Sequence, residues 1–279
     1  MSYITFSTIG EAGNLASQIQ QYASLYAIAK ETDKQIVFPE SSITRGFGFK
    51  FAEVLDIPIV TKPDSFFSNF KQIQANDRLI VDRNMFLLDK DTNYNVSNRF
   101  DLFHYWHEKY SKEVSEWEWN KKYLEQATEE YSKIKLQGKE TVAIHVRRGD
   151  YLLPQHGHFC RLEHNYYEAA LQHFFKNIDN YQFIVFSNDI EWCKQNLLEE
   201  SEIVKFIEPG ADYIDLILMS LCDHTIIANS SYSWWAAYLN RNVNKKVICP
   251  TNYLVGSSPW AHINGNYYPP TWINIDNKN

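Results

Sequence analysis

Short apolar runs alternate with amphipathic segments through the second half of the chain. The runs at residues 142–146, 183–186, 204–207, 225–228 and 246–248 have the length and the β-branched content of buried strands. Between them, residues 166–176, 191–198, 213–221 and 234–239 place apolar side chains at helical spacing. Strict alternation of this kind predicts an α/β fold with a parallel, doubly wound sheet.

The first half opens with one similar unit. Residues 3–8 predict a strand, residues 16–30 a helix, and residues 35–38 a second strand that ends at Pro39. The first loop, residues 10–14, carries two glycines, so an anion or a sugar hydroxyl can approach its backbone, and Gly13 and Asn14 are candidate binding residues.

The middle of the chain has a weaker pattern. Residues 78–81 and 85–88 are candidate strands, and residues 103–110 begin or join a helix. A polar stretch at 133–140 marks a domain boundary near Glu140, which predicts α/β domains at 1–139 and 140–279. The tail, residues 274–279, is expected to be loose or to cross back over the first domain.

The strand at 142–146 leads directly into a cluster of charged residues. His145, Arg147, Arg148 and Asp150 stand at its carboxyl end, and Gly149 permits a sharp exit from it. In an open α/β sheet, ligands bind beyond the carboxyl ends of the strands. A guanidinium pairs bidentately with phosphate, so these arginines predict a phosphorylated substrate. The alternative is an arginine pair that only solvates a strand end.

Two further strand ends are polar. Ser187 ends one strand, and Asn229, Ser230 and Ser231 follow another, immediately before a predicted helix whose N-terminus is suited to phosphate. For each serine the alternative is plain helix capping. Three polar ends on one sheet edge together outline a nucleotide cleft, whereas residues 234–238 are expected to be helix core.

Composition narrows the possible partners. The net charge is −7 and no basic run occurs, so nucleic acid and anionic membrane are poor partners. The N-terminus lacks a secretory pattern and no stretch reaches 18 apolar residues, which predicts a cytoplasmic protein, with peripheral membrane attachment as an alternative. The four scattered cysteines predict buried free thiols.

One short acidic motif in the chain has two explanations, and two common nucleotide and hydrolase motifs are absent from the sequence. Asp89 and Asp91 form an Asp-x-Asp pair of the kind that holds a nucleotide through a divalent cation, but a solvated turn also explains them. A calcium loop fails there, since Tyr94 stands where glycine is needed and Phe100 where glutamate is needed. Neither a P-loop nor a Gly-x-Ser-x-Gly elbow is present.

Three segments carry a family resemblance. Residues 145–151, 215–220 and 226–239 strongly resemble the α-1,2-fucosyltransferases of glycosyltransferase family 11, with the sequences HVRRGDY, DLILMS and IIANSSYSWWAAYL. The resemblance implies a GT-B-like pair of Rossmann-type domains facing across a cleft, with GDP-fucose as donor substrate, held mainly by the second domain, and no cofactor.

The resemblance also implies roles for single residues. Arg147 would hold the diphosphate, His145 would lie near the nucleotide, and Ser230 and Ser231 would line the phosphates. Asp215 matches, in the related α-1,6-fucosyltransferases, an aspartate that reads guanine. Asn229 and Ser187 are further contacts.

The first loop departs from the family pattern. Three residues are inserted after Asn14, and Glu11 replaces a glycine, in a setting similar to the loop glutamate of some protein O-fucosyltransferases. Glu11 and Asp150 are therefore alternative catalytic bases, and either is alternatively structural, for example an acid that orients Arg147.

The expected reaction is inverting, metal-independent transfer of fucose from GDP-fucose to a glycan hydroxyl, with O2 of a terminal galactose as the expected acceptor. One rival is a metal-dependent glycosyltransferase that uses Asp89 and Asp91. Another is a non-catalytic module that binds GDP or glycan without turnover.

Overall fold

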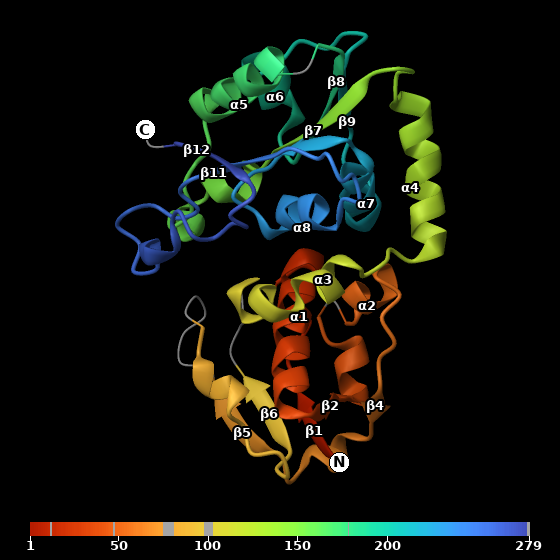
Figure 1. Ribbon diagram of the computed structural model, residues 1–279, viewed down its shortest axis with the longest axis vertical. Coiled ribbons are helices and arrows are strands. Elements are labelled where there is room, and N and C mark those ends of the chain that lie inside the picture. The colour runs from red at the N-terminus through yellow and green to blue at the C-terminus, as the bar shows by residue number, and fades with distance from the viewer. Residues whose placement is uncertain (12, 47, 75–80, 98–102, 178, 278–279) are drawn as a thin grey trace. The chain divides into compact units, whose positions relative to one another are not determined.

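The computed structural model describes residues 1–279 except 12, 47, 75–80, 98–102, 178 and 278–279 (Figure 1). The chain divides into two compact units, Met1–Asn120 and Lys121–Asn279. The sequence pattern put the boundary after the polar stretch near Glu140, whereas the division falls before helix α4 (Lys121–Ile134). This helix belongs to the second unit because its Tyr123 ring packs on Tyr213, with centroids 4.7 Å apart, and Tyr131 shares a hydrogen bond with Thr141.

The second unit is built on a six-stranded sheet. Its order is β9-β8-β7-β10-β11-β12, and every neighbouring pair is parallel. The strands are β7 (Glu140–Val146), β8 (Tyr181–Ser187), β9 (Val204–Ile207), β10 (His224–Ile226), β11 (Val247–Pro250) and β12 (Ile273–Ile275). In chain order this is 3-2-1-4-5-6, the doubly wound order of dinucleotide-binding sheets, in which ligands bind where the order reverses. Here that point lies between β7 and β10.

Helices cover both faces of this sheet. They are α5 (His164–Asn177), α6 (Ile190–Asn196), α7 (Asp212–Leu221) and α8 (Ser231–Leu239). Figure 1 shows α5 and α6 on one side and α7 and α8 on the other. Tyr166, Tyr167 and Phe174 of α5 are fully buried against the strands. The hydroxyls of the two tyrosines donate to the carbonyls of Ile227 and His145, which ties α5 to the carboxyl ends of the sheet.

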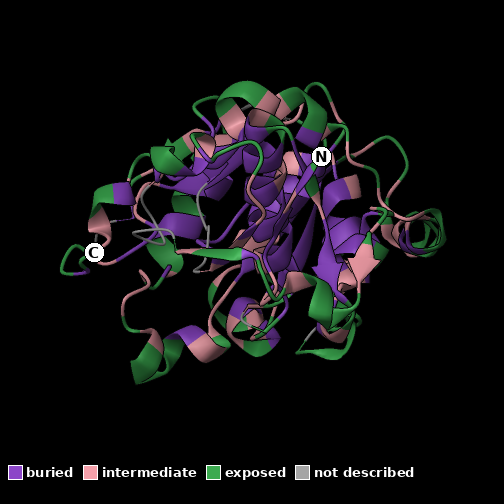
Figure 2. Ribbon diagram, turned by 90° about the horizontal axis from the view of Figure 1, so that it is seen from below, coloured by how far each residue is buried: buried purple, intermediate pink, exposed green. Residues whose placement is uncertain are grey.

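The first unit has a four-stranded parallel sheet of order β2-β1-β6-β5. The strands are β1 (Ser2–Thr5), β2 (Lys34–Ile36), β5 (Lys71–Gln74) and β6 (Tyr94–Ser97), and a separate parallel pair is formed by β3 (Phe38–Pro39) and β4 (Thr61–Lys62). The helices are α1 (Leu15–Thr32), α2 (Lys50–Val54) and α3 (His107–Ser115). Figure 2 shows buried residues along many of the strands and on helices as well, and exposed ones on outer turns of helices and loops.

The parallel α/β class expected from the sequence is confirmed, with local corrections. Residues 85–88 are not a strand: Arg83–Phe86 is a 3-10 helix, capped by the Asp82 side chain, which accepts from Asn84 N–H. Most of the other candidate strand, residues 78–81, lies outside the described residues. The described part of the tail, residues 274–277, is not loose, because β12 pairs with β11 and Asn277 accepts from Asn252 N–H in the same unit.

Several expectations about single residues can also be compared with the structure. All four cysteines are free thiols, three of them buried and Cys160 partly exposed. Trp234 and Trp235 are buried core of α8. Among the described residues, no helix is both long enough and apolar enough to cross a membrane.

Candidate active site

The candidate residues of the second unit gather where its strand order reverses. His145 ends β7, Arg147 and Asp150 follow it, and Ser230 and Ser231 stand between β10 and α8. Because β7 and β10 are paired in register from His224 to Ile226, their carboxyl ends lie side by side. Ser187 of β8 pairs with Val146 of β7, so all three polar strand ends predicted from sequence lie at this carboxyl edge of the sheet.

Arg147 is held in a fixed orientation by Asp150. The Arg147 Nη2 atom donates to Asp150 Oδ2 at 2.9 Å, and Nε lies 2.8 Å from Oδ1. The guanidinium also lies over the Tyr151 ring, with Cζ 5.6 Å from its centroid. Both side chains of the pair are about one third exposed, so the guanidinium keeps a surface that a ligand can reach.

Arg148 has a different environment. Its Nη1 donates to Glu163 at 2.8 Å, its Nε lies 3.5 Å from Asp189, and its guanidinium stacks 4.0 Å from the Trp192 ring centroid. Only 12% of the side chain is exposed. Two carboxylates and an aromatic face already surround its charge, so Arg148 is the less accessible of the two arginines and Arg147 the more accessible.

Asn188 is a residue that the sequence reasoning missed. Its Oδ1 accepts from Arg148 N–H at 3.0 Å, and its Nδ2 donates to Asp150 at 3.4 Å. A Cβ on Gly149 would lie 2.4 Å from Nδ2, so only glycine allows this approach. The available signal was its place in the polar end of β8, where Ser187 was chosen instead. Ser187 makes a local turn, its hydroxyl accepting from Asp189 N–H.

His145 is buried and neutral. Its Nδ1 shares a 2.8 Å hydrogen bond with the Ser233 hydroxyl, and its ring centroid lies 5.4 Å from that of Tyr232. Burial, and secondly the charge of Arg147, lower its pKa to about 3. The imidazole therefore stays uncharged at any physiological pH.

Ser230 and Ser231 lie at the N-terminus of α8, whereas the Asn229 side chain bonds to two loops. Ser230 caps α8, its hydroxyl accepting from Tyr232 N–H at 3.3 Å, and Ser231 is the first residue of the helix. The Asn229 amide donates to the carbonyls of Cys160 and Tyr253, so it joins loops below the site. A phosphate at this position would meet the N-terminus of α8.

Asp215 lies in the first turns of α7, near this edge. One oxygen accepts from Gly210 N–H at 3.2 Å, and burial raises the pKa of its carboxyl group. Burial also raises the pKa of Tyr232, and the charges of Asp215 and Arg147 then act on it in opposite directions. Tyr232, which the sequence reasoning did not single out, is thus within electrostatic reach of both candidate donor residues.

In the first unit, the loop after β1 carries Glu11, Gly13 and Asn14. Asn14 caps α1 by accepting from Ser17 N–H, and Gly13 has a φ of 89° that favours glycine. Glu11 Oε1 lies 3.2 Å from Arg45 Nη1, an ion pair in which both side chains are about 40% exposed. Glu11 is therefore accessible and has a cationic partner.

Asp89 and Asp91 form a turn. Asp89 Oδ1 accepts from Asp91 N–H at 2.8 Å, and the carbonyls of Asp89 and Lys90 accept from the Lys34 ammonium. A positive charge already bound at this turn disfavours a divalent cation. Within the described part of the chain, no cluster of three His, Cys, Asp or Glu residues suits a metal ion.

Comparison with known proteins was made on both sequence and structure. The family described as "Glycosyl transferase family 11" matches residues 2–276. The chain is 32% identical over 150 residues to the O-antigen biosynthesis glycosyltransferase WbnK of Escherichia coli, and 36% identical over 148 residues to an alpha-1,2-colitosyltransferase of the same organism. These alignments cover 52% and 49% of the chain and 48% of each relative, so the chain spans about half the length of these curated relatives.

A longer alignment and two structures extend this comparison. Galactoside alpha-(1,2)-fucosyltransferase 2 of Bos taurus is 26% identical over 284 residues, 96% of this chain and 78% of that protein. NodZ alpha-1,6-fucosyltransferase soaked with GDP-fucose superposes with a TM-score of 0.55 at 12% identity, covering 85% of this chain and 92% of its own. POFUT1 in complex with GDP gives 0.54 at 13%, covering 89% and 98%. These structures share the GT-B fold with this chain.

Proposed function

Since this chain belongs to glycosyl transferase family 11, as its match over residues 2–276 establishes, we propose that it transfers fucose from GDP-fucose to a glycan. The proposed acceptor is O2 of a terminal galactose, and the proposed reaction inverts the anomeric carbon and needs no metal. The names of the relatives, galactoside alpha-(1,2)-fucosyltransferase and alpha-1,2-colitosyltransferase, support this acceptor chemistry.

The observation that carries the proposal is the Arg147–Asp150 pair at the carboxyl end of β7. In the proposed reaction the acceptor oxygen attacks the anomeric carbon, the bond from that carbon to the diphosphate breaks, and its electron pair leaves with GDP. Negative charge grows on the diphosphate, where a preoriented guanidinium and the α8 N-terminus stabilise it. Arg147 needs no reorganisation to do this, because Asp150 already fixes its plane.

The same pair supports an orienting role for Asp150. Both of its oxygens lie within 2.9 Å of the Arg147 guanidinium, so they are already engaged in holding Arg147. Glu11 is the better candidate for the base, since it is accessible and stands on the loop after β1. It would accept the proton from the acceptor hydroxyl as the new bond forms.

A test of the base follows from this assignment. Glu11→Gln keeps the shape and removes the proton acceptor, so kcat should fall by about 10² to 10⁴ with GDP affinity unchanged. Arg45→Gln, which removes the cationic partner that Glu11 shares with Asp64, should have a smaller effect. A fully active Glu11→Gln enzyme would assign the base elsewhere.

Asp215 is proposed to read the guanine base. A carboxylate accepts two hydrogen bonds from guanine N1–H and the exocyclic amine, which uracil does not offer. Its raised pKa reflects a partly buried carboxyl group, and burial strengthens such a bond.

The donor sugar has a second candidate. The relative with the highest identity of those above, 36%, is a colitosyltransferase, which favours colitose as an alternative to fucose. The test is a panel of GDP-fucose, GDP-mannose, a GDP-colitose donor and UDP-sugars, scored for nucleotide release with galactose-terminated acceptors, with and without EDTA. Release from GDP-fucose in EDTA is the expected result. Release only with another donor, or only with added metal, would refute it, and GDP binding without release would favour a non-catalytic module.

A further inference from the structure

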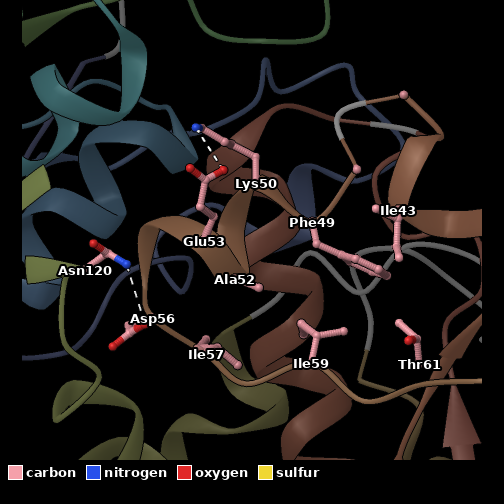
Figure 3. Close-up of a pocket in the computed structure, with 12 residues that line it drawn as sticks. Ile43, Phe49, Lys50, Ala52, Glu53, Asp56, Ile57, Ile59, Thr61 and Asn120 are labelled. Atoms are coloured by element: carbon pink, nitrogen blue, oxygen red, sulfur yellow. Dashed lines mark hydrogen bonds and ion pairs between the residues drawn. The ribbon is translucent and has the colours of Figure 1, made fainter. Parts of the chain in front are cut away.

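The first unit contains an open hollow of about 760 Å³ that none of the candidate residues above lines. It is formed by the chain before α2, by α2 itself and by the segment that leads to β4 (Figure 3). Its volume falls in the range of small-molecule sites, roughly 300 to 1,000 Å³.

The lining combines an apolar surface with planar polar groups. Ile43 is 51% exposed, and Phe49 is held against Phe38 with ring centroids 4.9 Å apart. Lys50 pairs with Glu53 at 3.2 Å, and Asn120 Nδ2 lies 3.5 Å from Asp56 Oδ1. In Figure 3 these two polar pairs lie on one side of the hollow, and Phe49 and Ile43 lie on the other. A pyranose ring needs both kinds of surface, since it has an apolar C–H face and an edge of hydroxyls that carboxylates and amides bind.

Asp56 occupies its position at a cost to stability. It follows the C-cap of α2 with a left-handed φ of 49°, where glycine is preferred. A negative charge is also unfavourable at the C-terminal end of a helix. Asp56 therefore lowers local stability in two ways, and it lines a hollow. Residues retained at a cost to stability are typical of binding sites.

The wall of the hollow touches the loop that carries Glu11. Gly46 lines the hollow, and a Cβ on it would lie 2.1 Å from the Gly10 carbonyl oxygen and 3.2 Å from Glu11 Cα. A sugar in the hollow would therefore lie close to a substrate group that contacts the Glu11 carboxylate.

We propose that the hollow binds the acceptor sugar that adjoins the galactose receiving the fucose, with Asp56 and Asn120 as its hydrogen-bonding groups and Phe49 as its apolar face. The proposal rests on the proposed function, and it makes the acceptor an oligosaccharide whose second sugar is recognised.

Asp56→Gly is a sharp test because it removes the carboxylate and suits the left-handed backbone. Asp33→Gly is the matched control: Asp33 is exposed, has a left-handed φ of 54° at the C-terminal end of α1, and does not line the hollow. Both variants should keep or raise the thermal midpoint. Asp56→Gly should raise KM for lactose about tenfold or more and leave KM for galactose and the slow hydrolysis of GDP-fucose unchanged, whereas Asp33→Gly should match wild type in all three.

The outcomes separate this inference from the proposed function. The inference is overturned if Asp56→Gly and wild type have equal KM values for lactose. It is also overturned if both enzymes prefer octyl galactoside to lactose. Either result leaves the proposed transferase activity standing. If the wild-type enzyme releases no GDP from GDP-fucose, the proposed function fails. Lactose binding, measured by saturation-transfer NMR, then tests the sugar site by itself. Weaker binding by Asp56→Gly than by Asp33→Gly supports the sugar site, and equal binding or none overturns it.

Discussion

Acidification should destabilise the second unit through His145. Its side chain is buried beside Ser233, and burial together with the nearby Arg147 charge lowers its pKa to about 3. In the unfolded chain the ring titrates near its ordinary value of 6.5. Below pH 6.5 the unfolded chain therefore binds a proton that the folded chain refuses, and stability falls as the pH falls.

The size of the effect follows from linkage. With pKa values of 6.5 unfolded and about 3 folded, this one ring costs about 2 kcal/mol of unfolding free energy between pH 7 and pH 5. The loss continues at about 1.4 kcal/mol for each further pH unit down to the folded pKa.

Urea unfolding at pH 7 and pH 5, followed by the fluorescence of the buried Trp234 and Trp235, measures this difference. His145→Asn removes the titration and retains a hydrogen-bonding group, so its stability should fall by about 2 kcal/mol less than that of wild type over the same interval. The other histidines are common to both proteins and cancel. An equal loss in the two proteins, or an NMR titration of the His145 ring between pH 5 and 8, would refute the reasoning.

Three further predictions concern the donor half of the site. Arg147→Lys keeps the positive charge but removes the guanidinium that can pair bidentately with phosphate, so turnover should fall by roughly 100-fold or more in the donor assay. Near wild-type activity would contradict the diphosphate role. Asp215→Ala should weaken GDP binding by over tenfold in calorimetry while UDP binding stays at its weak wild-type level, whereas unchanged GDP affinity would exclude it as the guanine reader. Gly149→Ala should lower stability by about 1 to 3 kcal/mol, because its Cβ would meet Asn188 Nδ2 at 2.4 Å, and adding Asn188→Ala should recover part of the thermal midpoint. Additive losses in that double variant would contradict the clash.

Sequence periodicity predicted β7, β8, β10 and β11 well because these strands are buried on both faces. They read as largely apolar runs, and the charged residues after β7 stand out against them. Strand β12, with the sequence INI and no fully buried residue, was missed. In the first unit β5 and β6 have the sequences KQIQ and YNVS, which carry no such signal, and the pairing of β6 with β1 joins residues about 90 positions apart in sequence. Helix α4 was missed because it follows directly on a segment with weak patterning.

Within the site, sequence identified residue types but not partners. The exit of β7 was recognised as polar, yet nothing in the order of residues tells that Arg147 pairs with Asp150 while Arg148 stacks on Trp192. These side-chain pairings depend on packing between β7, β8 and α6. Asn188 and Asp56 were missed for a related reason, since the close approach to Gly149 and the left-handed backbone at Asp56 exist only in three dimensions.

The strand order of the second unit has an evolutionary consequence. Every candidate donor residue from His145 to Ser231 lies on a single contiguous sheet unit, whose hydrogen-bonded ladder includes the chain's own C-terminal strand β12. Glu11 and the Asp56 hollow are encoded separately, within the first 120 residues. Under the proposed function, substitutions in the first unit would change acceptor recognition without altering the sheet that carries the candidate donor residues, so a lineage could take up new acceptors and keep its donor chemistry.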